Sequence, residues 1–227
     1  MFSTEGFLYR ICTWIYHFTL LNLLFLITCI PIITLFPALA AAFGVSRQWM
    51  KKNESPIIPT YFKLFRENFR QSMIIGIFMV IFGLLLYADF HIIIQIHSAI
   101  KIALYLFFCF MMVFYIAIIL HVFPLMVNSY YSTKQLLVNA LKYSLYKFHL
   151  TLLNMVCIYM IFLIALKFPV IFVFFFSSIC IFLTYWHINK KFVIFEALQK
   201  IQGEIDGHVK TENANMWIQG FFIGDRS

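Results

Sequence analysis

The side chains that could do chemistry in this chain are a few histidines and acids set in a very apolar sequence. Asp89, His91 and His97 form its best metal-like grouping, since two imidazoles and a carboxylate could hold zinc or another divalent ion. Their spacing matches no specific metal motif, and short polar loops often contain such residues by chance. We therefore expect no metal site.

His121 and His17 are the main ionisable side chains expected at membrane depth. Either imidazole could bind a ligand or sense pH, but we expect His121 to hydrogen-bond a backbone carbonyl or to reach the interface. All nine acids fall outside the expected spans, whereas pumps generally place ionisable groups within them. The sequence also contains no P-loop, no G-x-S-x-G elbow and no H-E-x-x-H. We therefore predict no catalytic residues, no cofactor and no enzyme activity.

The composition identifies the solvent of this chain as lipid. Of its 227 residues, 63% are hydrophobic and 11% are charged, and the mean hydropathy is +0.90. A soluble domain of this size has too little interior to hide so much apolar surface. The five cysteines lie in apolar segments without C-x-x-C spacing, which is typical of packing residues. The net charge of +8 fits basic loops that face anionic lipid and needs no nucleic acid.

Segments long enough to cross a membrane, which takes about 20 residues, account for most of the chain. We predict an all-α integral membrane protein, a bundle of about five transmembrane helices with amphipathic cytoplasmic interfacial helices. One transmembrane domain should cover residues 1–190, and a cytoplasmic amphipathic tail should cover 191–227, with an apolar patch at Met216–Ile223. The expected spans are residues 12–36, 71–87, 102–126, 151–166 and 168–186.

The orientation follows from the basic residues. With five spans, fourteen of the seventeen Lys and Arg residues fall on one side, which places the N-terminus outside and the tail in the cytoplasm. Residues 7–45 leave alternatives open. They could form one long span and a re-entrant piece, or two tight spans, which would put the N-terminus inside. The small residues Ala38–Leu39–Ala40 also resemble a signal-peptide cleavage site.

Two cytoplasmic segments have the pattern of interfacial helices. In residues 60–70, Phe62, Phe65 and Phe69 share one face and basic residues fill the other. Ser132 and Gln135 have capping-box spacing, so a second helix should begin there. Its shared face is expected to comprise Leu137, Ala140, Leu141 and Ser144.

Prolines and polar residues complete the set of structural or interface candidates. Pro31, Pro37 and Pro124 should break or terminate helices, and buried asparagines usually link helices. The full set is Asn22, Pro31, Thr34, Pro37, Phe65, Asn68, Phe69, His121, Pro124 and Asn139.

The motifs of residues 21–43, LNLLFLITCIPIITLFPALAAAF, resemble those of a known family. The YesL-like bacterial membrane proteins, catalogued as a domain of unknown function, typically show L-N-L-L/W, then P-[IV]-[IV]-T, then P-A-x-x-A. The resemblance continues through Phe65 and Asn68–Phe69, and later through Phe123–Pro124–Leu125 and the segment 136–141. A glycine common after the P-[IV]-[IV]-T step is replaced here by Leu35–Phe36.

The resemblance implies a function in sugar uptake, because family members are commonly encoded beside oligosaccharide importers. It implies a non-enzymatic accessory or assembly subunit of a carbohydrate ABC importer in the bacterial plasma membrane, with membrane lipid and permease subunits as partners. The loop 128–147 carries neither the acid nor the glycine of the permease coupling helix, so the chain is not expected to be the permease. The alternative is a stand-alone, small oligomeric transporter or channel. Its polar pathway would draw on Asn22, His121, Asn154, Ser177, Ser178 and Thr184.

Overall fold

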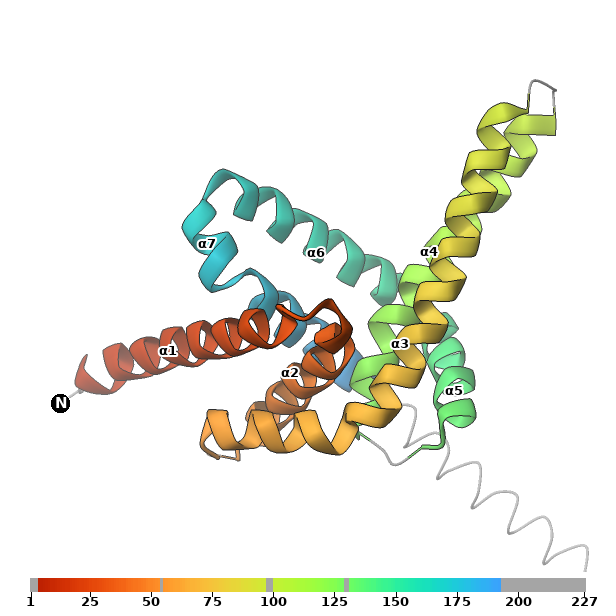
Figure 1. Cartoon of the computed structure of the whole chain (residues 1–227). Coiled ribbons are helices and arrows are strands. Elements are labelled where there is room, and N and C mark those ends of the chain that lie inside the picture. The colour runs from red at the N-terminus through yellow and green to blue at the C-terminus, as the bar shows by residue number, and fades with distance from the viewer. Residues whose placement is uncertain (1–3, 54, 97–99, 129–130, 193–227) are drawn as a thin grey trace, which may run out of the picture. The chain divides into compact units, whose positions relative to one another are not determined.

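A computed structural model describes residues 4–53, 55–96, 100–128 and 131–192, and the regular structure in these ranges is entirely helical (Figure 1). The chain divides into two compact units, Met1–Ile188 and Asn189–Ser227. Residues 193–227, which include the predicted apolar patch, lie outside the described part. The helices are α1 (Thr4–Cys29), η1 (Ile32–Thr34), α2 (Leu35–Met50), α3 (Ile57–Gln95), α4 (Ile100–Asn128), α5 (Thr133–Leu145), α6 (Phe148–Lys167) and α7 (Pro169–Phe174), followed by a helix over residues 176–192.

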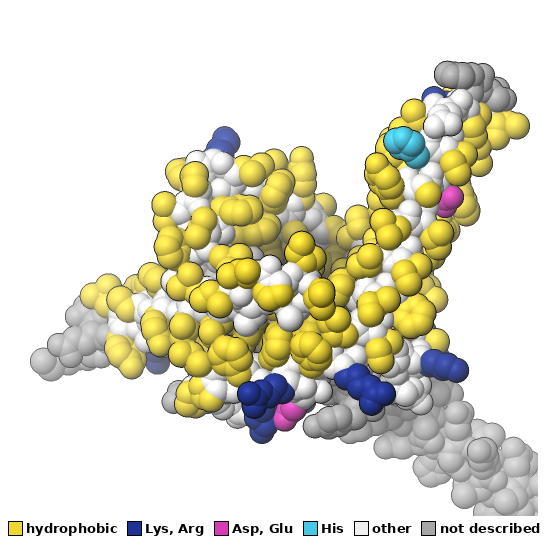
Figure 2. Space-filling view, in the orientation of Figure 1, with side chains coloured by type: hydrophobic (Ala, Val, Ile, Leu, Met, Phe, Trp, Pro, Cys, Tyr) yellow, Lys and Arg dark blue, Asp and Glu magenta, His cyan; other side chains and the backbone are white. Residues whose placement is uncertain are grey.

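Four of the described helices are long and apolar enough to cross a membrane. They are the Gly6–Cys29 part of α1, then α3, α4 and α6. Hydrophobic side chains cover most of the visible surface, and Lys and Arg gather mainly along one margin (Figure 2). The predicted class, an all-helical integral membrane protein, is confirmed, and the four long apolar helices of the described residues are close to the predicted count of about five.

The first predicted span, residues 12–36, is wrong at its end. Helix α1 stops at Cys29, because Pro31 takes an extended backbone conformation at φ −75° and ψ 111°. The chain then turns through η1 and returns as α2, which packs against α1. The Thr34 hydroxyl closes this turn, lying 2.5 Å from the Thr28 carbonyl oxygen and 2.6 Å from that of Pro31.

The prediction that three prolines break or terminate helices is correct only at Pro31. Pro37 lies in the first turn of α2, where a missing N–H breaks no intrahelical bond. Pro124 is buried within α4, and the helix continues to Asn128. In apolar surroundings neighbouring helices can hold such a helix together across the missing bond.

The expected fifth span, residues 168–186, is interrupted. Helix α7 ends at Phe174, Phe175 leaves the helical region at φ −133°, and a new helix starts at residue 176. By contrast, the expected interfacial segment 60–70 and the span 71–87 form one continuous helix, α3. Figure 1 shows its first turns lying crosswise and its later part rising beside α4.

Close packing of α2, α3 and α4 forms the centre of the first unit. The Phe36 ring of α2 stacks on Phe123 of α4, with centroids 6.1 Å apart and planes at 9°. Gly76 of α3 lies against Phe36, and a Cβ at that position would overlap the ring. Farther along, the Tyr115 hydroxyl of α4 donates to the Met79 carbonyl oxygen at 2.8 Å.

Helix α5 begins as predicted. The Ser132 hydroxyl accepts from the Gln135 N–H, and the Gln135 side chain accepts from the Ser132 N–H, which is a complete capping box. The predicted shared face is only half right, because Leu137 is half-buried and Leu141 is exposed. The buried face comprises Leu136, Ala140, Tyr143 and Ser144.

Candidate functional site

Asn22 bridges the break between α7 and the following helix. Its side-chain Nδ2 donates to the Val173 carbonyl oxygen at 2.5 Å, and its Oδ1 accepts from the Ser178 N–H at 3.2 Å. In an unbroken helix the Ser178 N–H would bond the carbonyl four residues earlier. One buried amide of α1 therefore satisfies a donor and an acceptor that the break releases, and membrane-embedded backbone needs such partners.

Two further buried polar residues of the expected spans also bond within the protein. The Asn154 Nδ2 of α6 donates to the Thr184 hydroxyl at 3.4 Å. The Nδ1 of His121 lies 2.7 Å from the Ala117 carbonyl oxygen, one turn earlier in α4. These contacts give Asn154 and His121 places in the helix packing.

A hydroxyl cluster, which sequence reasoning missed in part, joins the α1–α2 turn to α3. Tyr61 is fully buried, and its hydroxyl lies 2.6 Å from the Thr28 hydroxyl and 3.4 Å from the Ala38 carbonyl oxygen. Thr34 bonds the same turn through Thr28. Tyr61 lies four residues before Phe65 on the predicted aromatic face, and this spacing could have indicated it.

The remaining candidates lie on two separate helices. On α3, the Phe65 ring packs between those of Tyr61 and Phe69, and the Asn68 side chain donates to the Leu64 carbonyl oxygen at 2.9 Å. Asn139 is half-buried on α5. The ten predicted residues thus spread over α1, the α1–α2 turn, α2, α3, α4 and α5 and do not converge on one site.

A metal site is absent from the described ranges, which contain no grouping of three His, Cys, Asp or Glu side chains. Asp89 and His91 lie in α3, and His97 is outside the described residues.

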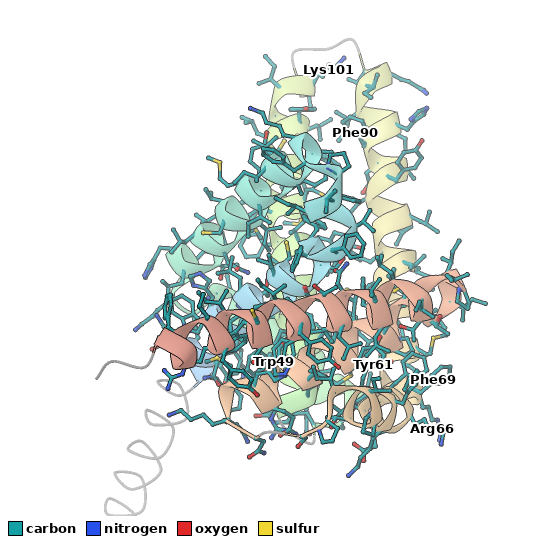
Figure 3. All side chains as sticks on the ribbon, turned by 90° about the vertical axis from the view of Figure 1, so that its left-hand side faces the viewer. Trp49, Tyr61, Arg66, Phe69, Phe90 and Lys101 are labelled. Carbon is teal, nitrogen blue, oxygen red and sulfur yellow. The ribbon has the colours of Figure 1, made fainter. Side chains whose placement is uncertain are left out.

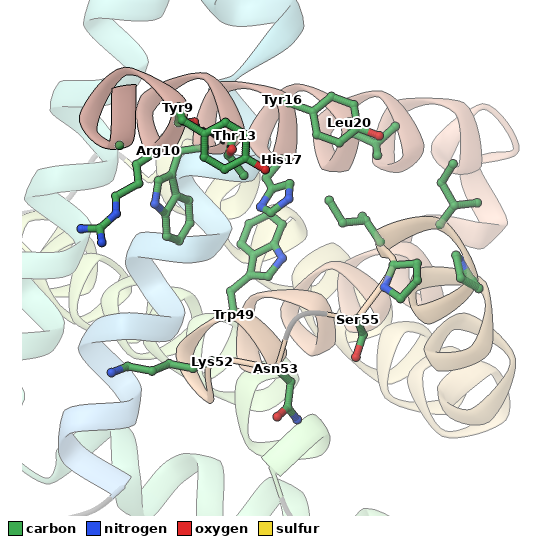
Figure 4. Close-up of a pocket in the computed structure, with 16 residues that line it drawn as sticks. Tyr9, Arg10, Thr13, Tyr16, His17, Leu20, Trp49, Lys52, Asn53 and Ser55 are labelled. Atoms are coloured by element: carbon green, nitrogen blue, oxygen red, sulfur yellow. Dashed lines mark hydrogen bonds between the residues drawn. The ribbon is translucent and has the colours of Figure 1, made fainter. Parts of the chain in front are cut away.

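A separate cavity lies between the first half of α1 and the connection from α2 to α3 (Figure 4). Its volume is about 1050 Å³. Positions 6, 9, 10, 13, 14, 16, 17 and 20 line it from α1, and this spacing is that of one helical face. The stripe Tyr9, Arg10, Thr13, Tyr16 and His17 could have been noticed in the sequence. The sequence does not indicate which segment packs opposite these residues, because this depends on the turn at Pro31 that brings α2 back along α1.

Aromatic rings form one wall of this cavity. The Trp49 indole of α2 stacks on the His17 ring, with centroids 5.6 Å apart and planes at 13°. Trp14 meets Trp49 edge to face at 5.9 Å. Phe18 and Phe182 pack against the same indole, so the wall is held from more than one helix.

Cations and neutral polar groups form the rest of the lining. Arg10 and Lys52 supply the positive charge, and Thr13, Asn53 and Ser55 supply hydroxyl and amide groups. Among the lining residues that the structure describes there is no Asp or Glu.

The end of α2 fixes where the α2–α3 connection starts. Lys52 has a left-handed backbone, φ 57°, and the Asn53 N–H donates to the Gln48 carbonyl oxygen at 3.1 Å. These bonds close α2 in the manner of a Schellman motif and fix where the connection starts.

The cavity lies on the basic side of the molecule. Figure 3 shows Trp49 and Arg66 near one end of the first unit and Lys101 near the other. Arg10 and Lys52 line one cavity, so the first half of α1 is on the same side as the α2–α3 connection. This arrangement agrees with the alternative of two tight spans in placing the N-terminal half of α1 on the side of that connection. Helix α2, with 16 residues, is not among the described helices long enough to cross a membrane.

Comparison with known proteins identifies relatives of unknown function. Residues 18–90 match the family described as protein of unknown function, DUF624. The uncharacterized protein YesL of Bacillus subtilis (strain 168) is 31% identical over 136 residues, 58% of this chain and 63% of YesL. The uncharacterized protein YteU of the same organism is 28% identical over 127 residues, 54% of this chain and 57% of YteU.

The aligned region spans less than two thirds of the length of either relative. No solved structure matches the chain. The two relatives and the family match nevertheless agree with the motifs of residues 21–43. They confirm that the chain resembles the YesL-like membrane proteins, and the match to the DUF624 family model covers residues 18–90.

Proposed function

We propose that this chain is a non-enzymatic accessory or assembly subunit of a carbohydrate ABC importer in the bacterial plasma membrane, with its C-terminal tail in the cytoplasm. The YesL-like resemblance supports the association with sugar importers. The observation in the structure that carries the proposal is an apolar ridge on α5, made of Val138, Leu141 and Leu145.

The α5 ridge lies on the opposite side of the helix from its packed face. Val138, Leu141 and Leu145 are 52%, 42% and 49% exposed, and their spacing places them along one line of the helix. The packed face, which includes Leu136 and Ala140, contacts the rest of the first unit. Helix α5 is a short helix between two spans, so the ridge is available to a partner at the interface.

The surroundings of the α5 ridge favour a protein partner on the cytoplasmic side. Lys134 and Lys142 are exposed on the same helix, and basic residues collect in cytoplasmic loops. An apolar centre with charged neighbours is the usual composition of a protein interface. A permease subunit with an apolar strip bordered by acids would complement it.

The internal bonding of the buried polar residues favours this proposal over a stand-alone transporter or channel. A transport pathway would need polar groups free to meet a substrate. The Asn22 Oδ1 accepts from the Ser178 N–H across the helix break, the Asn154 Nδ2 donates to the Thr184 hydroxyl, and His121 contacts the Ala117 carbonyl oxygen. The Asn154 Oδ1 is the one atom of these three side chains that is buried without a hydrogen-bond partner in the described part.

The test is an affinity pull-down of the tagged full chain from native membranes in mild detergent, with partners identified by mass spectrometry. We expect permease subunits of a sugar importer at near-stoichiometric levels. The double variant Leu141→Gln, Leu145→Gln should lower their recovery about tenfold or more, because each leucine removed from an interface costs about 1.5 kcal/mol or more.

The matched control is Arg66→Gln, which changes an exposed residue of α3 away from the α5 ridge and its charged neighbours and should leave recovery close to that of the unmodified chain. If the protein is recovered alone or only with itself, the proposal fails. Substrate flux through the purified protein would then support the transporter alternative.

A further inference from the structure

We infer that the cavity between α1 and the α2–α3 connection binds the headgroup of an anionic phospholipid. This inference does not depend on the proposed function, because it concerns a different surface from the α5 ridge.

The lining has the chemistry of a phosphate site. Arg10 and Lys52 reach toward the same side of the cavity (Figure 4), and guanidinium and ammonium groups are the usual partners of phosphate oxygens. Thr13, one turn after Arg10 in α1, adds a hydroxyl group that can donate a hydrogen bond, whereas Ser55 lies on the other side of Trp49 in Figure 4. An anion at this edge of the cavity would lie in the field of two cationic residues, and the described lining adds no carboxylate.

The aromatic wall and the apolar edge indicate a lipid in particular. Trp and Tyr side chains concentrate at the level of lipid headgroups, and Tyr9, Trp14 and Trp49 all line this cavity. Leu20 and Ile58 extend the lining with apolar surface, and Ile58 is half exposed. A phospholipid presents a charged phosphate joined to an apolar glyceride, which matches both parts of the lining.

The size and the place of the cavity agree with this ligand. Its volume of about 1050 Å³ is at the upper end of the range of small-molecule sites. It lies on the side where most Lys and Arg residues gather, and the cytoplasmic leaflet carries the anionic lipids. A neutral oligosaccharide could stack on Trp49, but it would bring no negative charge to Arg10 and Lys52, which meet no carboxylate among the described lining residues.

The experiment measures lipid binding to the purified full chain by native mass spectrometry during titration with phosphatidylglycerol and, separately, phosphatidylcholine. We expect phosphatidylglycerol to bind at least tenfold more tightly. The variant Arg10→Gln, Lys52→Gln should lose about tenfold or more in affinity for phosphatidylglycerol and little for phosphatidylcholine. Added salt should weaken the binding of the unmodified chain more than that of the variant.

The matched control is Arg66→Gln, Lys51→Gln, which removes the same two charges from exposed positions on the same side but outside the lining. It should bind phosphatidylglycerol like the unmodified chain. Equal loss in both variants would show diffuse surface attraction and overturn the inference.

Two competing ligands test whether the cavity binds free phosphate or a sugar and not an anionic phospholipid. Inorganic phosphate that displaces the lipid at similar concentration would show a free-phosphate site. A neutral tetrasaccharide that does so would show a sugar site. Either result overturns the inference, whereas displacement only by anionic phospholipid supports it. Size-exclusion profiles of all variants show whether each remains folded.

Discussion

Asn22 shows how one polar side chain allows a helix to break inside an apolar protein. A broken helix exposes N–H and C=O groups that lipid cannot satisfy. The amide of Asn22 has one donor group and one acceptor group, and it gives them to Val173 and Ser178 on the two sides of the break. Leucine has the same approximate size but offers neither group.

The variant Asn22→Leu should therefore lower the free energy of unfolding. Each buried backbone group left unsatisfied costs about 1–3 kcal/mol, so the melting temperature in detergent should fall clearly. The control is Asn68→Leu, since the Asn68 side chain bonds only within its own helix turn and is half exposed. Equal melting temperatures for the two variants would contradict the role assigned to Asn22.

At the scale of elements, α2 and α3 approach closely where Gly76 lies against Phe36. The Phe36 ring cannot withdraw easily from Gly76, because the same ring is stacked on Phe123. Gly44 also lies at a close contact, but its nearest neighbour is the end of the flexible Leu64 side chain. The two glycines thus differ in what an added methyl group would meet.

Gly76→Ala should destabilise the protein by about 1–3 kcal/mol, the usual cost of overpacking. Thermal unfolding in detergent would measure it. Gly44→Ala should cost less, since Leu64 can change rotamer. Combining Gly76→Ala with Phe36→Leu should recover part of the loss, and no recovery would mean that the Phe36 ring is not the obstacle.

The sequence predicts those elements whose signals are local. Spans 102–126 and 151–166 lie within α4 and α6, and Ser132 and Gln135 form the predicted cap of α5. The buried face of α5 is harder to predict, because apolar residues occur on both sides of that helix. The break at Phe175 has no local signal at all, since its stabilising partner, Asn22, is far away in sequence. The cavity also lacks a local sequence signal, because the α1–α2 turn decides which segments face each other across it.

For the whole molecule, the cavity changes the expected topology. If Arg10 is counted with Lys52, the assignment of loops from the sequence leaves only Lys101 and Lys167 for the opposite side. This distribution follows the positive-inside rule more closely than an external N-terminus does. We therefore expect the N-terminus and the C-terminal tail both to be cytoplasmic.

Single cysteines in a chain without its five natural ones would test this topology. A membrane-impermeant maleimide should label Lys101→Cys in intact cells, whereas Arg10→Cys and Lys51→Cys should react only after permeabilisation. Labelling of Arg10→Cys in intact cells would place the N-terminus outside and contradict the shared side of the cavity.

The bond between Asn22 and the helix break also has a consequence for biogenesis. Asn22 is 151 residues before Val173 and 156 before Ser178, so α1 leaves the ribosome long before the segment that satisfies its amide. During synthesis α1 therefore enters the bilayer with an unpaired polar group, which insertion factors and membrane proteases can recognise. A chain that stops after α6 should be degraded rapidly, and the completed contact would mark the protein as fully assembled.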